Sequence, residues 1–299
     1  GEALWIGGEI LGGGNILVYP GRQLTIGGDV TLGKNLYNNG ELRWSAGNLI
    51  TDGGTIQNLS GRTFTILSTG TLSTTGPTTT LINYGTLNRE GPGQSTIAVR
   101  FSNYPSQTLF GFPPFPPPLP PGTVDVRDGT LAITGTLVEK TGDAMYGAAN
   151  WYVSSSTARL LLPGPNLRIA TGTFLLSGVN ASFPQLEEAQ SIGYLTLANG
   201  RAFTFSNAAA GLTQLTIDSP GYSLTLPGLT IPGLTINGGN VTINGMSGDS
   251  VFVDADASLT LRGPSQFSYA QVSGPGLIRL EGSPHWRGGE IAGPGQPLI

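Results

Sequence analysis

The sequence predicts an all-β protein, a single-stranded right-handed parallel β-helix (β-solenoid), forming one domain over residues 1–299. Three observations predict this fold. The chain is rich in Gly and Pro and poor in charge, short apolar-Thr-apolar triplets recur along it, and two longer motifs repeat at a regular spacing. The spacing fits coils of about 20–22 residues, a length typical of solenoid repeats, and therefore roughly 14 coils.

The composition excludes several classes of protein. The 47 Gly and 22 Pro residues disfavour helices, while only 11% of residues are charged and 38% are hydrophobic, which argues against disorder. With 14 Lys and Arg residues and a net charge of −4, the chain is a poor partner for nucleic acid. The absence of Cys excludes disulfides and thiolate chemistry. No apolar run is long enough for a transmembrane helix, so we expect no membrane insertion.

The two longer motifs define the repeat. The pattern Trp-x-[Gly/Ala]-Gly starts at Trp5, Trp44 and Trp286, so the chain begins and ends on the same motif, as a piece of a longer repeat array would. The pattern Asn-x-Gly starts at Asn38 and Asn83, and a third copy starting at Asn103 is interrupted by residues 105–121 before it resumes at Gly122. We expect these asparagines to form inward ladders that bind the corner backbone from coil to coil.

The triplets predict short strands with alternating faces. Successive strand side chains point to opposite faces, so the outer two residues of each triplet should enter the core and Thr should point outward. Pro-Gly and Asn-Gly turns between triplets fit tight corners, because Gly readily adopts positive φ. The triplets include 24–26, 64–66, 195–197, 203–205, 215–217 and 259–261, and four follow almost directly at 224–226, 229–231, 234–236 and 241–243.

One alternative remains open for the fold. Turn signals every 8–12 residues also suit a pair of antiparallel β-sandwiches, although the longer period favours the solenoid. Helix is nearly absent, and we expect at most one short helical turn within 182–190. Because an open-ended solenoid carries unpaired backbone at its ends, end-to-end assembly into an extracellular fibre is a further possibility.

The motifs also carry a family resemblance. The Trp and Asn-Gly motifs, together with Gly-Thr-Val-Asp-Val-Arg-Asp-Gly-Thr-Leu-Ala-Ile-Thr-Gly over 122–135, resemble the shaft repeats of filamentous-haemagglutinin-like and autotransporter passenger-like bacterial surface adhesins. The resemblance implies an extracellular or cell-surface location. It also implies a stiff β-helical stalk whose loops bind host or neighbouring-cell proteins or glycans.

The most distinctive local feature is the proline-rich segment 105–121. Because Pro cannot donate to a β-ladder, the segment should leave the sheet and favour polyproline II. Its apolar side chains could form a recognition arm for a partner, or could instead fold back onto the shaft. The candidate binding residues are Phe110, Phe112, Phe115 and Leu119.

The sequence predicts no catalytic residues, no metal site and no cofactor. A carbohydrate-active β-helix enzyme remains the alternative and would need two converging carboxylates. The acidic candidates and the single His fit solvated or structural positions better; they are Asp125 and Asp128 flanking Arg127, Glu187 and Glu188, Asp254 and Asp256, and His285. Calcium could bind at Asp52, Asp249 or Asp254, but the chain lacks the nonapeptide repeat of calcium-binding β-rolls.

Outward threonines could in principle form an ice-binding or glycan-binding grid. The pairs with suitable spacing appear scattered along the chain, and Thr is a good strand former in any case, so a structural role is favoured. These pairs are 63/65, 69/71, 134/136 and 171/173.

Overall fold

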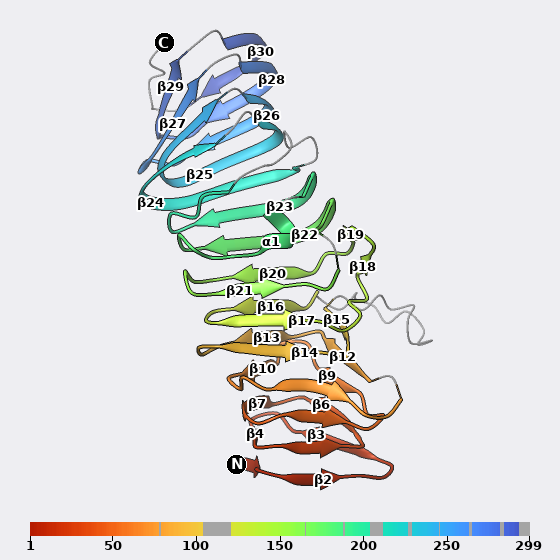
Figure 1. Ribbon diagram of the computed structural model, residues 1–299. Coiled ribbons are helices and arrows are strands. Elements are labelled where there is room, and N and C mark those ends of the chain that lie inside the picture. Colours follow the sequence, from red (N-terminus) through yellow and green to blue (C-terminus); the bar gives the residue numbers. More distant parts are fainter. Residues whose placement is uncertain are drawn as a thin grey trace. The chain divides into compact units, whose positions relative to one another are not determined.

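The computed structural model shows an all-β parallel β-solenoid of about 12 turns with almost no helix, which confirms the predicted fold class (Figure 1). It describes residues 1–77, 79–103, 121–164, 166–187, 189–203, 212–226, 229–244, 246–262, 265–281 and 284–292. The chain divides into two compact units, Gly1–Pro165 (unit 1) and Asn166–Ile299 (unit 2). The single domain expected over 1–299 stays a prediction.

Unit 1 winds through three parallel stacks of strands, which we call faces A, B and C. Face A contains β1 (Glu2–Trp5), β4 (Gln23–Gly27), β7 (Glu41–Ala46), β10 (Thr63–Ile66), β13 (Thr86–Arg89), β16 (Thr123–Val126) and β20 (Asn150–Val153). Face B contains β2 (Gly8–Ile10), β5 (Val30–Leu32), β8 (Leu49–Thr51), β11 (Thr71–Thr74), β14 (Gln94–Ile97), β17 (Thr130–Ile133) and β21 (Arg159–Leu161). Face C contains β3 (Asn15–Val18), β6 (Asn35–Asn38), β9 (Ile56–Asn58), β12 (Thr80–Asn83) and β15 (Arg100–Ser102).

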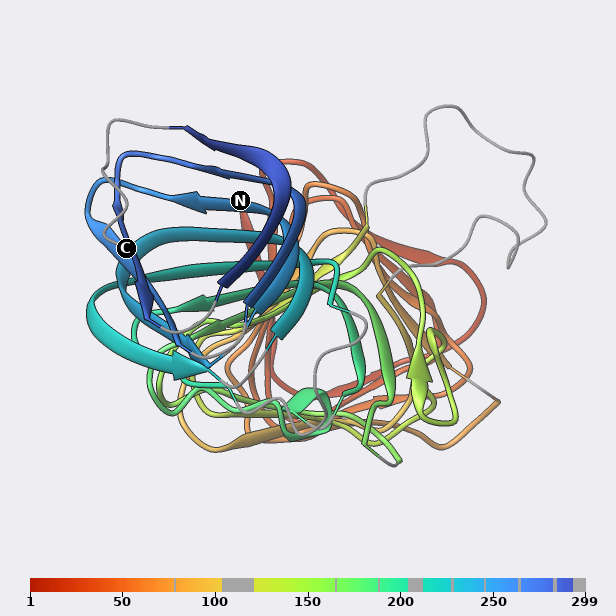
Figure 2. The same ribbon diagram turned by 90° about the horizontal axis from the view of Figure 1, so that it is seen from above.

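The core of unit 1 consists of apolar side chains stacked from turn to turn. On face A, strand register aligns Leu42, Phe64, Leu87, Val124 and Trp151, and none of these side chains is exposed. The alternation predicted from the triplets explains this stack, since every second residue of each strand points inward. Viewed from above, the strands wind around this interior (Figure 2).

The predicted asparagine ladder is present on face C. The Asn38 Nδ2 donates to Asn58 Oδ1 (2.7 Å), Asn58 Nδ2 to Asn83 Oδ1 (2.8 Å), and Asn83 Nδ2 to Asn103 Oδ1 (2.7 Å). All four side chains are buried. The same amides also donate to corner carbonyls, for example from Asn38 to Thr63 O at 2.8 Å. The ladder therefore satisfies buried backbone acceptors while tying four turns together.

The glycine of each Asn-x-Gly motif is required by close packing. A Cβ on Gly85 would lie 2.2 Å from the carbonyl oxygen of Arg62, and one on Gly122 would lie 2.1 Å from that of Asn83. No side chain fits at either corner, which explains why the motif specifies Gly.

Unit 2 contains longer strands that bend from one side of the solenoid to the next. They are β22 (Ile169–Ser177), β23 (Ser191–Ala198), β24 (Gln214–Leu226), β25 (Leu229–Asn244), β26 (Met246–Val253), β27 (Ala257–Arg262), β28 (Ser265–Ser273), β29 (Leu277–Glu281) and β30 (Pro284–Ala292). The expected helical turn within 182–190 is α1 (Pro184–Glu187).

The burial of the described triplets of unit 2 is as predicted, but the short strands and tight corners expected over 229–243 are wrong, because these residues form one continuous strand, β25. Most of the triplet 203–205 lies outside the described residues. In Leu215-Thr216-Ile217 both outer residues are fully buried, and the four tandem triplets from 224 to 243 show the same pattern. This unit also contains a rank of single outward threonines, which the pattern of threonine pairs does not include. Register aligns Thr196, Thr216 and Thr235 on consecutive turns.

The turn count is lower than the predicted value of roughly 14. Ladder asparagines 58 and 83 are 25 residues apart, while 38 and 58 are 20 apart, so some turns exceed the expected length. Residues are also taken up by segment 105–121 and by an antiparallel hairpin of β18 (Lys140–Thr141) and β19 (Ala144–Met145).

Candidate functional site

The predicted binding residues Phe110, Phe112, Phe115 and Leu119 lie outside the described residues. The structure does place both ends of their segment at one corner of unit 1, between β15 and β16. The Gly122 amide donates to the Asn103 carbonyl at 2.9 Å, and Thr123 pairs in register with Thr86 of the turn before. The solenoid therefore resumes after the segment in the register that it had before it.

Unit 1 contains a polar groove on face A, which the sequence analysis did not identify. It encloses about 400 Å³ and is lined by Gly1, Glu2, Gly21, Arg22, Gln23, Gly40, Glu41 and Arg62. Strand register places Glu2, Gln23 and Glu41 at the first position of three successive strands. The row could not be predicted from the sequence, because the first turns differ in length.

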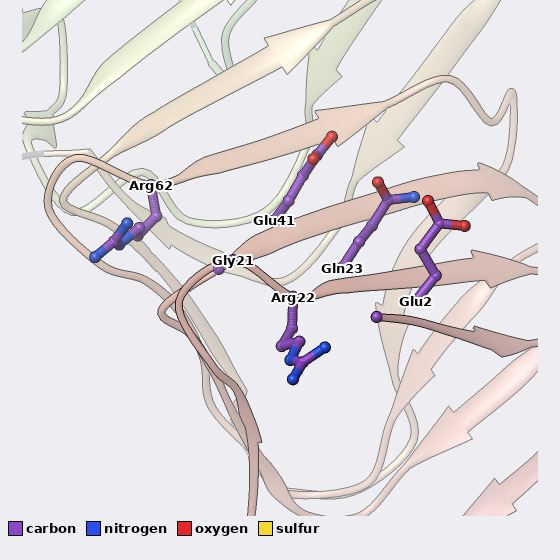
Figure 3. Close-up of a pocket in the computed structure, with 8 residues that line it drawn as sticks. Glu2, Gly21, Arg22, Gln23, Glu41 and Arg62 are labelled. Atoms are coloured by element: carbon purple, nitrogen blue, oxygen red, sulfur yellow. The ribbon is translucent and has the colours of Figure 1, made fainter.

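The charges of the groove form two separate rows. Figure 3 shows the side chains of Glu2, Gln23 and Glu41 on one side and those of Arg22 and Arg62 directed away from them. Arg62 Nε donates to Asn39 Oδ1 at 3.0 Å. Within the part of the chain that the structure describes, none of these four charged side chains forms an ion pair.

The floor of the groove is set by glycine. A Cβ on Gly40 would lie 2.3 Å from the Arg22 carbonyl oxygen, so no side chain fills the space between the two arginine corners. Since Glu2, Arg22 and Glu41 are exposed, the groove offers solvated charges of both signs. It lacks the desolvated carboxyl group on which general-acid catalysis usually depends.

The acidic residues around Arg127 form a structural cluster across three turns. Arg127 binds Asp125 Oδ2 through Nε (2.7 Å) and Glu90 Oε1 through Nη1 (3.0 Å). The other oxygen of Asp125 accepts a hydrogen bond from Ser154. Hydrogen bonding to Asp125, with further attraction to both carboxylates, raises the pKa of Arg127. Both carboxylates are thus held by one guanidinium, which favours a structural role.

Arg89 is the most unusual charged residue, because it points into the core of unit 1. It follows Ile66 and precedes Val126 in the same inward stack, and its side chain is not exposed. Its guanidinium donates to five backbone carbonyls: Ile66 and Thr130 (both 3.4 Å), Pro92 (2.9 Å), Gly93 (3.1 Å) and Glu90. Burial lowers the pKa of Arg89, and attraction to Asp128 opposes this.

The remaining acidic candidates are dispersed. Asp254 accepts a hydrogen bond from the Ala255 amide in a turn, Asp256 is exposed, and Glu187 pairs with Arg201. Glu188 and the side chain of His285 lie outside what the structure describes. Among the described residues, no group of three or more His, Asp or Glu side chains could hold a metal ion. Likewise, no helix described here has both the length and the apolar character needed to span a bilayer.

Comparison with known proteins adds no family to this description. No protein-family model, no curated protein and no solved structure matches the chain. The resemblance to adhesin shafts therefore remains a prediction, while the parallel β-solenoid is shown by the structure.

Proposed function

We propose that the chain is a structural and adhesive segment of a large secreted or cell-surface bacterial protein. In this proposal, stacked β-solenoid turns form a stiff stalk that displays a binding loop, residues 105–121, and the chain performs no catalysis. The observation that carries the proposal is the continuity of the ladder across that loop. The Asn83 amide donates both to Asn103, before the segment, and to Thr123 O, after it.

This continuity matters because the residues that hold the solenoid together are then different from those of the proposed binding loop. The hydrogen bonds between turns on both sides of the segment are made by residues outside it. The sequence of the segment can therefore change without destabilising the stacked turns. Binding residues are commonly carried in this way on loops held by a rigid scaffold. The apolar and aromatic residues of the segment then supply contact area for a partner.

Deleting residues 105–121 is expected to leave the fold intact and to abolish attachment. The deletion joins Tyr104 to Gly122 and so restores an uninterrupted Asn-Tyr-Gly-Thr sequence, the same as that at 83–86. The measurement is attachment of beads coated with the 299-residue chain, or with the deleted chain, to bacterial cells, epithelial cells and extracellular matrix.

The control is thermal unfolding, which should change little because the ladder bonds persist. Replacing Phe110, Phe112 and Phe115 with Ser provides a second variant of unchanged length. Attachment by the deleted and triply substituted chains as strong as that by the intact chain, or no attachment by the intact chain, would refute the proposed role of the segment.

A carbohydrate-active enzyme is the second candidate, and the groove on face A is the observation that favours it. Glu2 and Glu41 lie two strands apart, with only Gln23 between them. Two strand spacings place their backbones about 9–10 Å apart, close to the carboxylate separation of inverting glycosidases. Against this candidate, both carboxylates are exposed to water.

A further inference from the structure

One side of unit 2 carries two neighbouring ranks of outward side chains, which we call the threonine face. Strand pairing aligns them over five turns of β22, β23, β24, β25 and β26. The first rank is Thr173, Tyr194, Gln214, Gly233 and Ser250, and the second is Leu175, Thr196, Thr216, Thr235 and Phe252.

The direction of these side chains follows from the residues between them. The intervening positions are all buried in the core: Phe174, Leu195, Leu215, Leu234 and Val251. Since strand side chains alternate, the two flanking ranks must point outward. The threonine face is therefore an ordered surface, fixed by the core beneath it.

Two large aromatic side chains are exposed on this face. Tyr194 is 51% exposed and Phe252 is 40% exposed. They lie three strands apart, which corresponds to about 14–15 Å along the stack. Between them lie Gln214, Thr216 and Thr235, together with Gly233, which carries no side chain.

A shallow cavity of about 280 Å³ occupies the Tyr194 end of the face. Its lining contains hydroxyl, amide and aromatic groups and no charged side chain: Thr173, Tyr194, Leu195, Thr196, Gln214 and Thr216. The only charged residue in β22, β23 and β24 is Asp218, which is exposed. The face thus combines stacking surfaces with neutral hydrogen-bonding groups.

We propose that the threonine face binds a neutral polysaccharide. An exposed aromatic ring stacks on the apolar C–H face of a pyranose, and threonine hydroxyls and a glutamine amide can both donate to and accept from sugar hydroxyls. One sugar unit of an extended glycan spans about one strand spacing, so a chain running along the stack meets an equivalent position on each turn. Tyr194 and Phe252 then contact sugar units three apart.

The absence of charge selects among possible ligands. A polyanion such as nucleic acid or an acidic glycan is bound through Lys and Arg, and neither occurs in the two ranks, while Asp218 would repel an anion. Ice binding would need two continuous threonine ranks, but Tyr194, Gln214 and Gly233 interrupt one of them. This inference goes beyond the proposed function, because the face lies in unit 2 and does not include segment 105–121.

The test is binding of the 299-residue chain to β-1,3-glucan, β-1,4-glucan and mannan, with polygalacturonate as the anionic comparison. We expect at least one neutral polysaccharide to bind, and Tyr194→Ala to weaken this binding about tenfold. Thr216→Val, which keeps the shape but removes the hydroxyl, should also weaken it. The matched control is Tyr146→Ala, because Tyr146 is 53% exposed in unit 1 and should not matter.

Other outcomes decide against the proposal. It is overturned if no neutral polysaccharide binds, if Tyr194→Ala binds as the unchanged chain does, or if only polygalacturonate binds. Affinity for the neutral ligand should persist at about 1 M salt, where charge-based binding is screened. The chain lacking 105–121 should retain this binding, so failure of the proposed attachment role and failure of the glycan site give different results.

Discussion

Replacing Arg89 with Met is expected to lower the free energy of unfolding by about 3–5 kcal/mol. Methionine fills much of the same inward space between Ile66 and Val126 but donates no hydrogen bond. The Arg89 guanidinium donates to the carbonyls of Glu90, Pro92 and Gly93, and the substitution removes these hydrogen bonds from the corner formed by residues 90–93. The buried carbonyls left without hydrogen-bond donors lower the stability by more than the apolar contacts of methionine raise it.

Further variants separate this effect from a general loss of packing. Arg89→Lys retains the charge but offers a single ammonium group in place of the planar fork, so it should fall between the wild type and Arg89→Met. Arg43→Met changes an exposed arginine of β7 and should alter stability by less than about 0.5 kcal/mol. Urea unfolding followed by circular dichroism makes the comparison. Equal stability of Arg89→Met and Arg43→Met would contradict the assigned role.

Replacing Asn58 with Leu is expected to cost about 2–4 kcal/mol of unfolding free energy. Asn58 is one of the two inner rungs of the ladder, accepting from Asn38 and donating to Asn83 and to Thr86 O. The substitution removes these bonds and leaves buried amide groups of both neighbouring rungs unsatisfied. The effect should spread to adjacent turns, so hydrogen exchange of the backbone amides in β6, β9 and β12 should accelerate together.

The matched control for Asn58 is Asn15. Asn15 also takes part in an inter-turn amide bond, accepting from Asn35 Nδ2 at 3.2 Å, but this pair is exposed to water. Water can replace the lost bond, so Asn15→Leu should cost less than about 1 kcal/mol. If the two substitutions were equally costly, burial of the ladder would not be the source of its stabilising effect.

The sequence could predict those features that repeat locally. The triplets specify which residues point inward, because alternation along a strand needs no knowledge of distant residues. The Asn-x-Gly motif specifies the ladder, because the corner excludes any Cβ at Gly85 and Gly122 and presents carbonyls to the amide. The interrupted copy at 103–122 is also predictable, because the motif resumes unchanged after the segment, and Asn103 is the last rung of the ladder.

Features that depend on register could not be predicted. The groove needs Glu2 and Glu41 on one row, and the threonine face needs Thr196, Thr216 and Thr235 on another; both require the length of every intervening turn. The inward position of Arg89 could not be predicted for a different reason. A charged residue at an inward position contradicts the alternation rule, and only the carbonyls of residues 90–93 and their neighbours explain it.

We expect the charged side chains of this chain to support the fold and to display binding residues, and not to catalyse. The most direct measurement is depolymerisation of neutral and acidic polysaccharides by the 299-residue chain, with product lengths followed over time and a Glu2→Gln/Glu41→Gln double variant run alongside. We expect neither protein to shorten any polysaccharide. Shortening by the unchanged chain that disappears in the double variant would contradict this expectation and would identify the groove on face A as an active site.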